Sequence, residues 1–399
     1  MSYAPFLGNT IFYESRQKRG AIMIYFDNAA TGGRKPDVVL SAVTAATKVC
    51  ANPGRSGHKL SLSCAKLVQD CRNELNGVFQ GYGYERVVFT KNCTEALNIA
   101  LFGTLRQGDH VIVSCMEHNS VLRPLEKLKK DGVIHYDVCP LRGNKENATL
   151  DLQSLRALIQ PNTRLVAIST ASNVNGLIPN LSAVKAAIPQ HVLLLCDGAQ
   201  GAGHFPLRMQ EFGIDFLTIA GHKGLHALQG SGALLFSNRI DPTPLLYGGT
   251  GSLSVSLDMP DFYPDGLEAG TLAFPAVLSL LEGVRYTQAH LSTIQNRLRA
   301  LTEYLLRGLR RLEHYQTYSI ANDCGIVAIK HAFLQSEFIA DCLSSVYDIA
   351  VRGGLHCAPL MHEALGTLDD GLVRVSFSHY NTEKEIDTLL FALQDLQRR

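Results

Sequence analysis

Two apolar stretches of this chain each lead into a side chain that can ionise. Leu193–Cys196 is followed directly by Asp197, and Asp215–Ala220 is followed by Lys223. If both stretches are strands of an open α/β sheet, their carboxyl ends meet where such sheets bind ligands. A lysine amine and a carboxylate placed there suit pyridoxal phosphate (PLP). The amine forms a Schiff base with the cofactor aldehyde, and the carboxylate keeps the pyridinium nitrogen protonated, so that the ring withdraws electrons.

Three more polar side chains follow apolar stretches in the same region, and each has two interpretations. Thr94 and the backbone N–H groups around it could bind phosphate at a helix start, or Thr94 could be an ordinary helix N-cap. His118 could stack on a cofactor ring, or it could be a surface residue of a loop. Asn173 could bind a carboxylate through its side-chain amide, or it could belong to a turn.

The elements that must position these residues alternate between strand and helix from Pro36 to Phe236. This alternation predicts an α/β domain in which helices cover both faces of a mainly parallel, seven-stranded sheet. The expected strands are Val87–Thr90, His110–Ser114, Val133–Val138, Leu165–Thr170, Val192–Asp197, Phe216–Ile219 and Gly232–Ser237. The expected helices are Ser61–Phe79, Thr94–Leu105, Val121–Lys130, Leu152–Ile159 and Ser182–Ile188.

A second, smaller domain is expected after the Gly- and Pro-rich region Pro242–Gly270. A long helical pattern from Pro275 to Leu312 leads into a mixture of strand and helix patterns, which predicts an α+β fold. We therefore divide the chain into an N-terminal extension (1–22), a large PLP-binding domain (23–275) and a small C-terminal domain (276–399). Met23 directly precedes the first expected strand and is an alternative start of the protein.

Composition excludes several classes of function. The net charge is +1, with 46% apolar and 18% charged residues and no basic stripe, so we expect no nucleic-acid partner. No apolar run reaches about 18 residues, so we expect no membrane span. The ten cysteines are scattered without metal-ligand spacing, which favours free thiols in a reducing compartment and no metal site. The N-terminus lacks a signal-peptide pattern, and we expect a cytoplasmic protein.

A set of short motifs in collinear order carries a family resemblance from about Met23 to the C-terminus. They are Asp27–Thr31, Cys93–Ala96, Glu117–His118, Ser172–Asn173, Asp197–Gln200, Gly221–Lys223, Glu268–Thr271 and Arg352–Ala358. With these motifs the chain resembles the cysteine desulfurase and selenocysteine lyase family, in the class V aminotransferase group of fold type I PLP-dependent transferases.

The resemblance implies a role for individual residues. Lys223 would bind PLP covalently, Asp197 would pair with the ring nitrogen, His118 would stack on the ring, and Gln200 would bond the phenolic oxygen. Cys93 would contact the cofactor as well. The phosphate would be held by Thr94, His222 and, from the partner subunit of a homodimer, Thr271. The substrate would be bound by Asn173 and Arg374 at its carboxylate, with Ala29 and Arg352 beside them. Cys357 would take the sulfur.

The sequence around Arg374 and Cys357 agrees with the roles of these two residues. Arg374 interrupts the apolar stretch Leu372–Phe377, so its guanidinium needs an anionic partner, and a carboxylate suits it, although an Arg on an edge strand could also be exposed. Cys357 lies in a Gly-rich loop near Arg352 and His356. Positive charge near a thiol lowers its pKa from the ordinary value of about 8.5 and favours the nucleophilic thiolate.

The sequence departs from the family pattern at two places. Ala220 stands where relatives have a Ser or Thr whose hydroxyl binds phosphate, and one such hydrogen bond contributes roughly 0.5–1.5 kcal/mol. His226–Ala227 replaces a Gly-Pro pair, so the path of the loop after Lys223 is not fixed by the resemblance.

The resemblance implies a cysteine desulfurase. It would convert L-cysteine to L-alanine and transfer sulfur to Cys357 as a persulfide, which a protein acceptor would collect for uses such as iron–sulfur cluster assembly. The alternatives are a selenocysteine lyase or another class V PLP lyase or aminotransferase, and a PLP-binding protein with little turnover. Only Ala220 favours the last of these.

Overall fold

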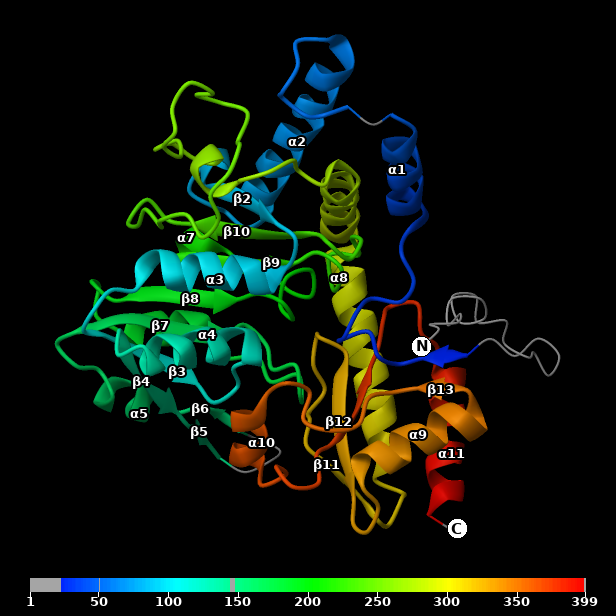
Figure 1. Cartoon of the computed structure of the whole chain (residues 1–399). Helices are drawn as coiled ribbons and strands as arrows, with labels where there is room; N and C mark the ends of the chain where they lie inside the picture. The colour runs from blue at the N-terminus through cyan, green and yellow to red at the C-terminus, as the bar shows by residue number, and fades with distance from the viewer. Residues whose placement is uncertain (1–22, 50, 144–147, 398–399) are drawn as a thin grey trace, which may run out of the picture.

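The computed structural model describes residues 23–49, 51–143 and 148–397, so the expected N-terminal extension lies outside the described residues. Its centre is a seven-stranded sheet (Figure 1). In spatial order the strands are β2 (Val87–Thr90), β10 (Gly232–Phe236), β9 (Phe216–Ala220), β8 (Leu193–Asp197), β7 (Thr163–Ser169), β3 (Asp109–Ser114) and β4 (Ile134–Cys139). Only β10 runs antiparallel to its neighbours. The predicted mainly parallel sheet is confirmed, with each strand within two residues of its expected bounds.

Helices cover both faces of this sheet, which explains why its central strands are apolar along their whole length. The helices α3 (Cys93–Thr104) and α4 (Asn119–Lys130) pack on one face, where their buried side chains form one apolar cluster with the sheet. The opposite face carries a second cluster. It is formed with α2 (Lys59–Val78), α5 (Leu152–Ala157), α6 (Leu181–Ala187), α7 (Met209–Phe212) and the first half of α8 (Phe274–Leu309).

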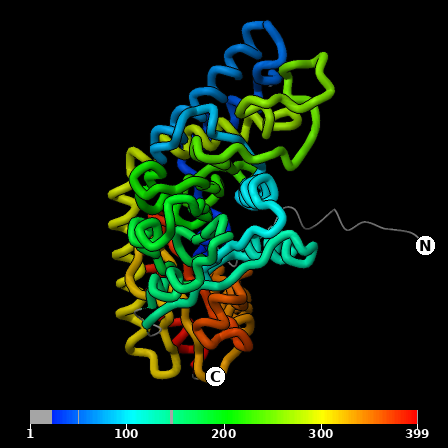
Figure 2. Tube along the Cα trace, turned by 90° about the vertical axis from the view of Figure 1, so that its left-hand side faces the viewer, coloured from blue at the N-terminus to red at the C-terminus, as the bar shows by residue number. Residues whose placement is uncertain are grey.

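The helix α8, 36 residues long, connects the sheet to a smaller α+β unit, and its second half belongs to the core of that unit. The small unit consists of the strands β11 (Tyr315–Thr317), β12 (Ile326–His331) and β14 (Val373–Ser376) and the helices α9 (Ser336–Tyr347), α10 (Pro359–Leu365) and α11 (Glu383–Leu396). Figures 1 and 2 show it at the opposite end of the molecule from α2. The predicted α+β domain is thus confirmed as a fold.

The first described residues contact this small unit rather than the large sheet. The short strand β1 (Ile24–Tyr25) pairs in parallel with β13 (Ile349–Ala350), and the ring of Phe26 packs edge-on against Phe377 at 5.2 Å. The N-terminal segment then crosses to the large sheet through α1 (Asp37–Lys48), which packs against α8. The division into 23–275 and 276–399 stays a prediction.

The remaining elements are short. They are the strands β5 (Leu141–Arg142) and β6 (Thr149–Leu150) and the 3-10 turns Tyr84–Arg86 and Asp265–Leu267. No helix in the described part of the chain combines the length and the apolar character needed to cross a membrane.

A glycine of α8 brings this helix close to the loop that follows Lys223. A Cβ atom at Gly283 would lie 2.1 Å from the backbone oxygen of Leu225, whereas a Cβ at Gly77, in α2, would have no neighbour within 4 Å. We expect Gly77→Ala to raise the free energy of unfolding by about 0.5–1 kcal/mol, because alanine favours the helix. We expect Gly283→Ala to lower it by roughly 1–3 kcal/mol, because backbone must move. Urea unfolding of both variants measures this, and equal effects would contradict the close packing.

Candidate active site

Asp197 and Lys223 lie at the carboxyl ends of neighbouring parallel strands, as predicted. Asp197 is the last residue of β8, and Lys223 follows β9 by three residues. The register pairs Asp197 of β8 with Thr218 of β9, so Asp197 and Lys223 lie at the same edge of the sheet. Burial lowers the pKa of the Lys223 amine from its ordinary value, and the nearby Asp197 carboxylate opposes that change.

The Asp197 carboxylate is 5% exposed, and its contacts are weak for a buried charge. Its Oδ1 accepts a hydrogen bond from the Ala199 N–H at 2.9 Å and lies 3.4 Å from the Cys93 thiol. Within the described residues, no Lys, Arg or His nitrogen forms an ion pair with it inside 4.0 Å. A buried carboxylate without a paired cation is costly, so a cationic ligand group such as a protonated pyridine nitrogen fits this position.

A cavity of about 110 Å³ lies between these two residues. It is lined by eight of the residues predicted from the sequence: Cys93, Thr94, His118, Asn173, Asp197, Gln200, His222 and Lys223. Ala220 and Ser120 line it as well. The structure therefore brings together, from five separate loops, most of the side chains expected to contact PLP.

His118 is held in a defined orientation at this cavity. It is the N-cap of α4, and its Nδ1 accepts a hydrogen bond from the Ser120 N–H at 3.0 Å. Burial lowers the pKa of His118 to about 4. At neutral pH the ring is therefore uncharged, and because Nδ1 is an acceptor, the proton is on Nε2. An uncharged flat ring fixed in this way suits stacking on a cofactor ring.

The start of α3, which also lines the cavity, offers groups for an anion. The N-cap of α3 is Asn92, whose side chain accepts from the Glu95 N–H at 2.9 Å, so the interpretation of Thr94 as the N-cap is wrong. The Thr94 hydroxyl instead lies 2.9 Å from the hydroxyl of Ser120. The first N–H groups of a helix have no acceptor within the helix, so they remain available to a phosphate.

Two further predicted residues of this cavity have protein contacts of their own. His222 Nδ1 lies 3.0 Å from the Thr31 hydroxyl, and burial lowers the pKa of His222 to about 4. Gln200 donates its Nε2 hydrogen to the Ala29 carbonyl at 2.9 Å. Its Oε1 is buried and has no partner among the described residues, so this amide can still take a ligand contact.

Arg374 is buried and already has an anionic partner, which the sequence analysis missed. Its Nη2 forms an ion pair with Asp27 Oδ1 at 2.8 Å, and its Nη1 donates to the Asn173 carbonyl at 2.9 Å. The Nε atom, in contrast, is buried without a partner among the described residues. Arg352 lies beside it through an antiparallel bridge to Arg374. Neither arginine lines the cavity, so the Nε–H of Arg374 is a buried donor behind the cavity residues.

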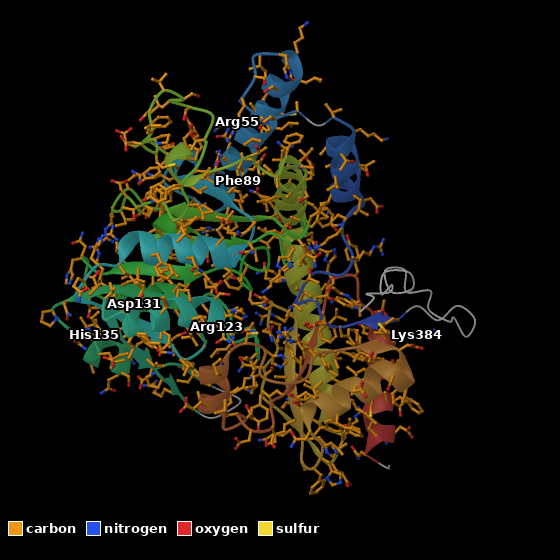
Figure 3. All side chains as sticks on the ribbon, viewed as in Figure 1. Arg55, Phe89, Arg123, Asp131, His135 and Lys384 are labelled. Carbon is orange, nitrogen blue, oxygen red and sulfur yellow. The ribbon has the colours of Figure 1, made fainter. Side chains whose placement is uncertain are left out.

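Cys357 lies outside the cavity wall, in a groove of about 450 Å³. Arg123 of α4, labelled in Figure 3, lines the same groove. Thr94, His118 and Ser120 line both spaces, so the groove and the cavity adjoin. The backbone of Cys357 is left-handed, with φ of 58°, and its carbonyl accepts from the Asn119 N–H at 2.7 Å.

Only one of the two residues expected to bring positive charge to Cys357 does so. Arg352 Nη2 lies 3.9 Å from the thiol. His356, in contrast, is 2% exposed, donates its Nε2 hydrogen to the Leu372 carbonyl at 3.0 Å, and has its pKa lowered to about 2 by burial. His356 is therefore uncharged at neutral pH, and of these two residues only Arg352 brings positive charge to the thiol.

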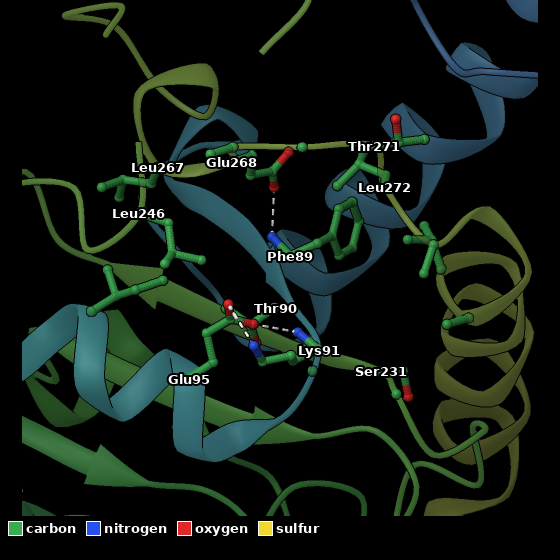
Figure 4. A pocket seen from close by; sticks show the side chains of 18 of the residues that line it. Phe89, Thr90, Lys91, Glu95, Ser231, Leu246, Leu267, Glu268, Thr271 and Leu272 are labelled. Atoms are coloured by element: carbon green, nitrogen blue, oxygen red, sulfur yellow. Dashed lines mark hydrogen bonds and ion pairs between the residues drawn. The ribbon is translucent and has the colours of Figure 1, made fainter. Parts of the chain in front are cut away.

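Thr271 is predicted to bind the cofactor but lies in a different pocket. It lines a pocket of about 280 Å³ beside β2, on the segment that leads from Glu268 to α8 (Figure 4). Glu268 holds this segment: it accepts from the Phe89 N–H at 2.6 Å and pairs with Arg72 at 2.6 Å. Thr271 does not line the cavity of its own chain. A residue that contributes to the partner subunit's cavity would lie outside its own in this way.

Glu117 is a buried carboxyl group behind the cavity, and its role was not anticipated. It is fully buried and is hydrogen-bonded by the Ser114 hydroxyl and by the N–H and hydroxyl of Ser169, the latter two at 2.6 and 2.9 Å. Burial raises its pKa to about 8. The neutral acid thus connects the His118 loop to the end of β7, next to Asp197 in the sheet.

Comparison with known proteins agrees with this geometry. The family model described as aminotransferase class-V matches residues 24–389. A probable cysteine desulfurase of Methanothermobacter thermautotrophicus is 30% identical over 94% of both chains, and a cysteine desulfurase of Yersinia pestis is 30% identical over 96% of both. Among solved structures, a cysteine desulfurase from Thermococcus onnurineus has a TM-score of 0.85 at 29% identity, covering 94% of this chain and 95% of that one. The cysteine desulfurase CsdA from Escherichia coli has 0.83 at 27%, with the same coverage.

The raised pKa of Glu117 predicts a pH-dependent stability. The pKa of Glu117 is 4.5 in the unfolded chain and about 8 in the folded protein, so at a pH between these values the carboxyl group takes up a proton on folding. Its stabilising contribution is complete below pH 4.5 and is lost as the pH rises toward 8. Glu117→Gln mimics the protonated acid and removes this loss. We expect the free energy of unfolding of the variant, minus that of the wild type, to be about 1–4 kcal/mol larger at pH 8 than at pH 5.

Urea unfolding of both proteins at the two pH values measures the change. Glu303→Gln, on an exposed part of α8, is the matched control. A wild-type-to-variant difference that is the same at pH 5 and pH 8 would contradict a neutral buried Glu117.

Proposed function

Because this chain belongs to the class V aminotransferase family, we propose that it is a PLP-dependent cysteine desulfurase that converts L-cysteine to L-alanine. One observation carries the proposal: the buried Asp197 carboxylate has no paired cation in the described part of the chain and lies at the same sheet edge as Lys223. The curated relatives that match nearly the full chain at 30% identity are named cysteine desulfurases, which supports the choice of reaction.

Different cavity residues would bind different parts of PLP. Asp197 would hold the protonated ring nitrogen, His118 would cover one face of the ring, and the start of α3 with Thr94 would hold the phosphate. Bound PLP supplies a ring that withdraws electrons and so stabilises negative charge at the Cα atom of an amino acid.

Lys223 would move the Cα proton. Its lowered pKa increases the fraction of neutral amine, the form that can accept a proton, near neutral pH. The buried Asp197 charge contributes fixed electrostatic stabilisation, which needs no rearrangement during the reaction.

The substrate carboxylate and sulfur would lie toward the small domain. The Nε of Arg374, which has no partner among the described residues, would donate to the carboxylate, with Arg352 beside it. Asn173 lies on the cavity wall, where its Nδ2 donates to the His356 carbonyl at 2.7 Å and has a second hydrogen for the carboxylate. The Cys357 thiolate would attack the substrate sulfur, forming an S–S bond as the Cβ–S bond breaks and its electron pair returns to the carbon skeleton. Cys357 would then carry a persulfide.

A homodimer is part of the proposal. Thr271 does not line its own chain's cavity, and the loop before it exposes apolar side chains, as subunit interfaces do. These exposed side chains are Leu245, Leu246, Tyr247, Leu253, Val255, Leu257 and Phe262. In the two views of the chain this loop lies at the end away from the small unit. A second copy that covers this loop would bring Thr271 toward the partner's phosphate site.

A sulfur acceptor and a reducing compartment complete the proposal. The Cys357 groove is open and carries the cations Arg123 and Lys127, which would favour an acceptor protein with an acidic surface. The nine cysteines within the described ranges are free thiols, which suits the cytoplasm. Iron–sulfur cluster assembly is one use of sulfur delivered in this way.

The decisive variant is Cys357→Ser. A hydroxyl is a much weaker nucleophile toward sulfur than a thiolate, so we expect alanine release from L-cysteine to fall by at least roughly a hundredfold and the enzyme-bound persulfide to disappear. PLP binding should persist, because Cys357 does not line the cavity. Alanine is measured by chromatography and the persulfide by mass spectrometry.

Cys342→Ser, at a partly exposed thiol of α9, is the matched control and should retain full activity. If the Cys357 variant released alanine from L-cysteine at the wild-type rate, the persulfide step would be wrong. If the wild-type protein released alanine from selenocysteine but not from L-cysteine, the selenocysteine lyase alternative would be favoured, because selenium leaves more easily than sulfur.

A further inference from the structure

Ser120 occupies a central position among the groups that line the cavity, although no motif pointed to it. It is the second residue of α4, and its hydroxyl oxygen lies 2.9 Å from the Thr94 hydroxyl and 2.9 Å from His118 Nδ1. It lines both the cavity and the Cys357 groove. One side chain therefore contacts the residue expected to bind phosphate and the residue expected to stack on the ring.

The hydrogen-bond partners of Ser120 leave its hydroxyl available to a ligand. Because His118 Nδ1 is an acceptor, the Ser120 hydroxyl at 2.9 Å can only donate to it. His118 Nδ1 also accepts the backbone N–H of Ser120 at 3.0 Å, so it keeps a partner when the hydroxyl proton turns to a ligand. The remaining neighbour, Thr94, has a hydroxyl that can act as donor or acceptor. An anion between these two hydroxyls could accept a hydrogen bond from each.

Other hydroxyls near the start of α3 are absent or engaged. Ala220, at the end of β9, is buried and has none to offer. Ser169 lines the cavity but donates its hydroxyl to Glu117 at 2.9 Å. In the described part of the cavity wall, Thr94 and Ser120 are the hydroxyls next to the first turn of α3, where backbone N–H groups also point.

We propose that Ser120 binds the phosphate group of PLP together with Thr94 and supplies the hydrogen bond that Ala220 cannot. This inference rests on the proposed function, since it requires that the chain binds PLP. The start of α3 gives the backbone donors and the helix dipole, and the two hydroxyls give side-chain donors from two different helices. The phosphate site then has two side-chain hydroxyls although Ala220 has none.

The test compares PLP with pyridoxal, which lacks the phosphate. Cofactor-free wild type and Ser120→Ala are titrated with each compound, and binding is followed by the change in absorbance, so no turnover is needed. A hydrogen bond to a charged group is lost in the variant, so PLP should bind roughly tenfold more weakly or worse, while pyridoxal should bind equally to both proteins. Ser120→Thr keeps a hydroxyl and should restore part of the PLP affinity.

A second substitution tests the exchange of positions directly. Ala220→Ser in the Ser120→Ala background should regain PLP affinity if the hydroxyl from β9 reaches the same phosphate. Ser63→Ala, at an exposed serine of α2, is the control and should change neither affinity.

Two outcomes would overturn the inference alone: unchanged PLP affinity in Ser120→Ala, or an equal loss for PLP and pyridoxal, which would mean that Ser120 acts on the ring through His118. Failure of the wild-type protein to bind PLP would overturn the proposed function together with this inference.

Discussion

The buried carboxylate of Asp197 is the constraint on which the rest of the site depends. A carboxylate that is 5% exposed and lacks a paired cation within the described structure is stable only if a cation is supplied close to it. The parallel pairing of β8 and β9 fixes the position of Asp197 and brings Lys223 to the same edge. The cofactor site is thus built into the strand order of the sheet, and the loops add the remaining contacts.

Burial keeps most other titratable groups around this charge neutral. It lowers the pKa of His118 and His222 to about 4 and that of His356 to about 2, and it raises the pKa of Glu117 to about 8. The charges that remain belong to groups that are expected to meet charged parts of PLP and substrate. In a site of low polarity these few charges act strongly, because neighbouring ones do not screen them.

The sheet and the residues at its edge could be predicted from the sequence because they are local. Apolar strands alternate with helices. Asp197 ends β8, and His118 and Asn173 each follow a strand by four residues, so their common location follows from the topology. The ion pair of Arg374 with Asp27 joins residues 347 positions apart, and the contacts of Ser120 depend on how α3 and α4 pack. The pairing of β1 with β13 is equally distant in sequence. No local pattern marks such contacts, and only the tertiary structure shows them.

The central claim is that Lys223, opposite Asp197, is the residue that binds PLP, and one measurement tests it directly. Borohydride reduction of the PLP-loaded protein makes the linkage between PLP and an amine permanent, and peptide mass spectrometry then locates it. Lys35 is the competing amine: it donates to the His222 carbonyl at 2.9 Å, and burial lowers its pKa to about 8. The account predicts that the modified peptide contains Lys223 and that Lys223→Ala abolishes the modification. Modification of Lys35, or of the Lys223→Ala variant at the wild-type level, would contradict it.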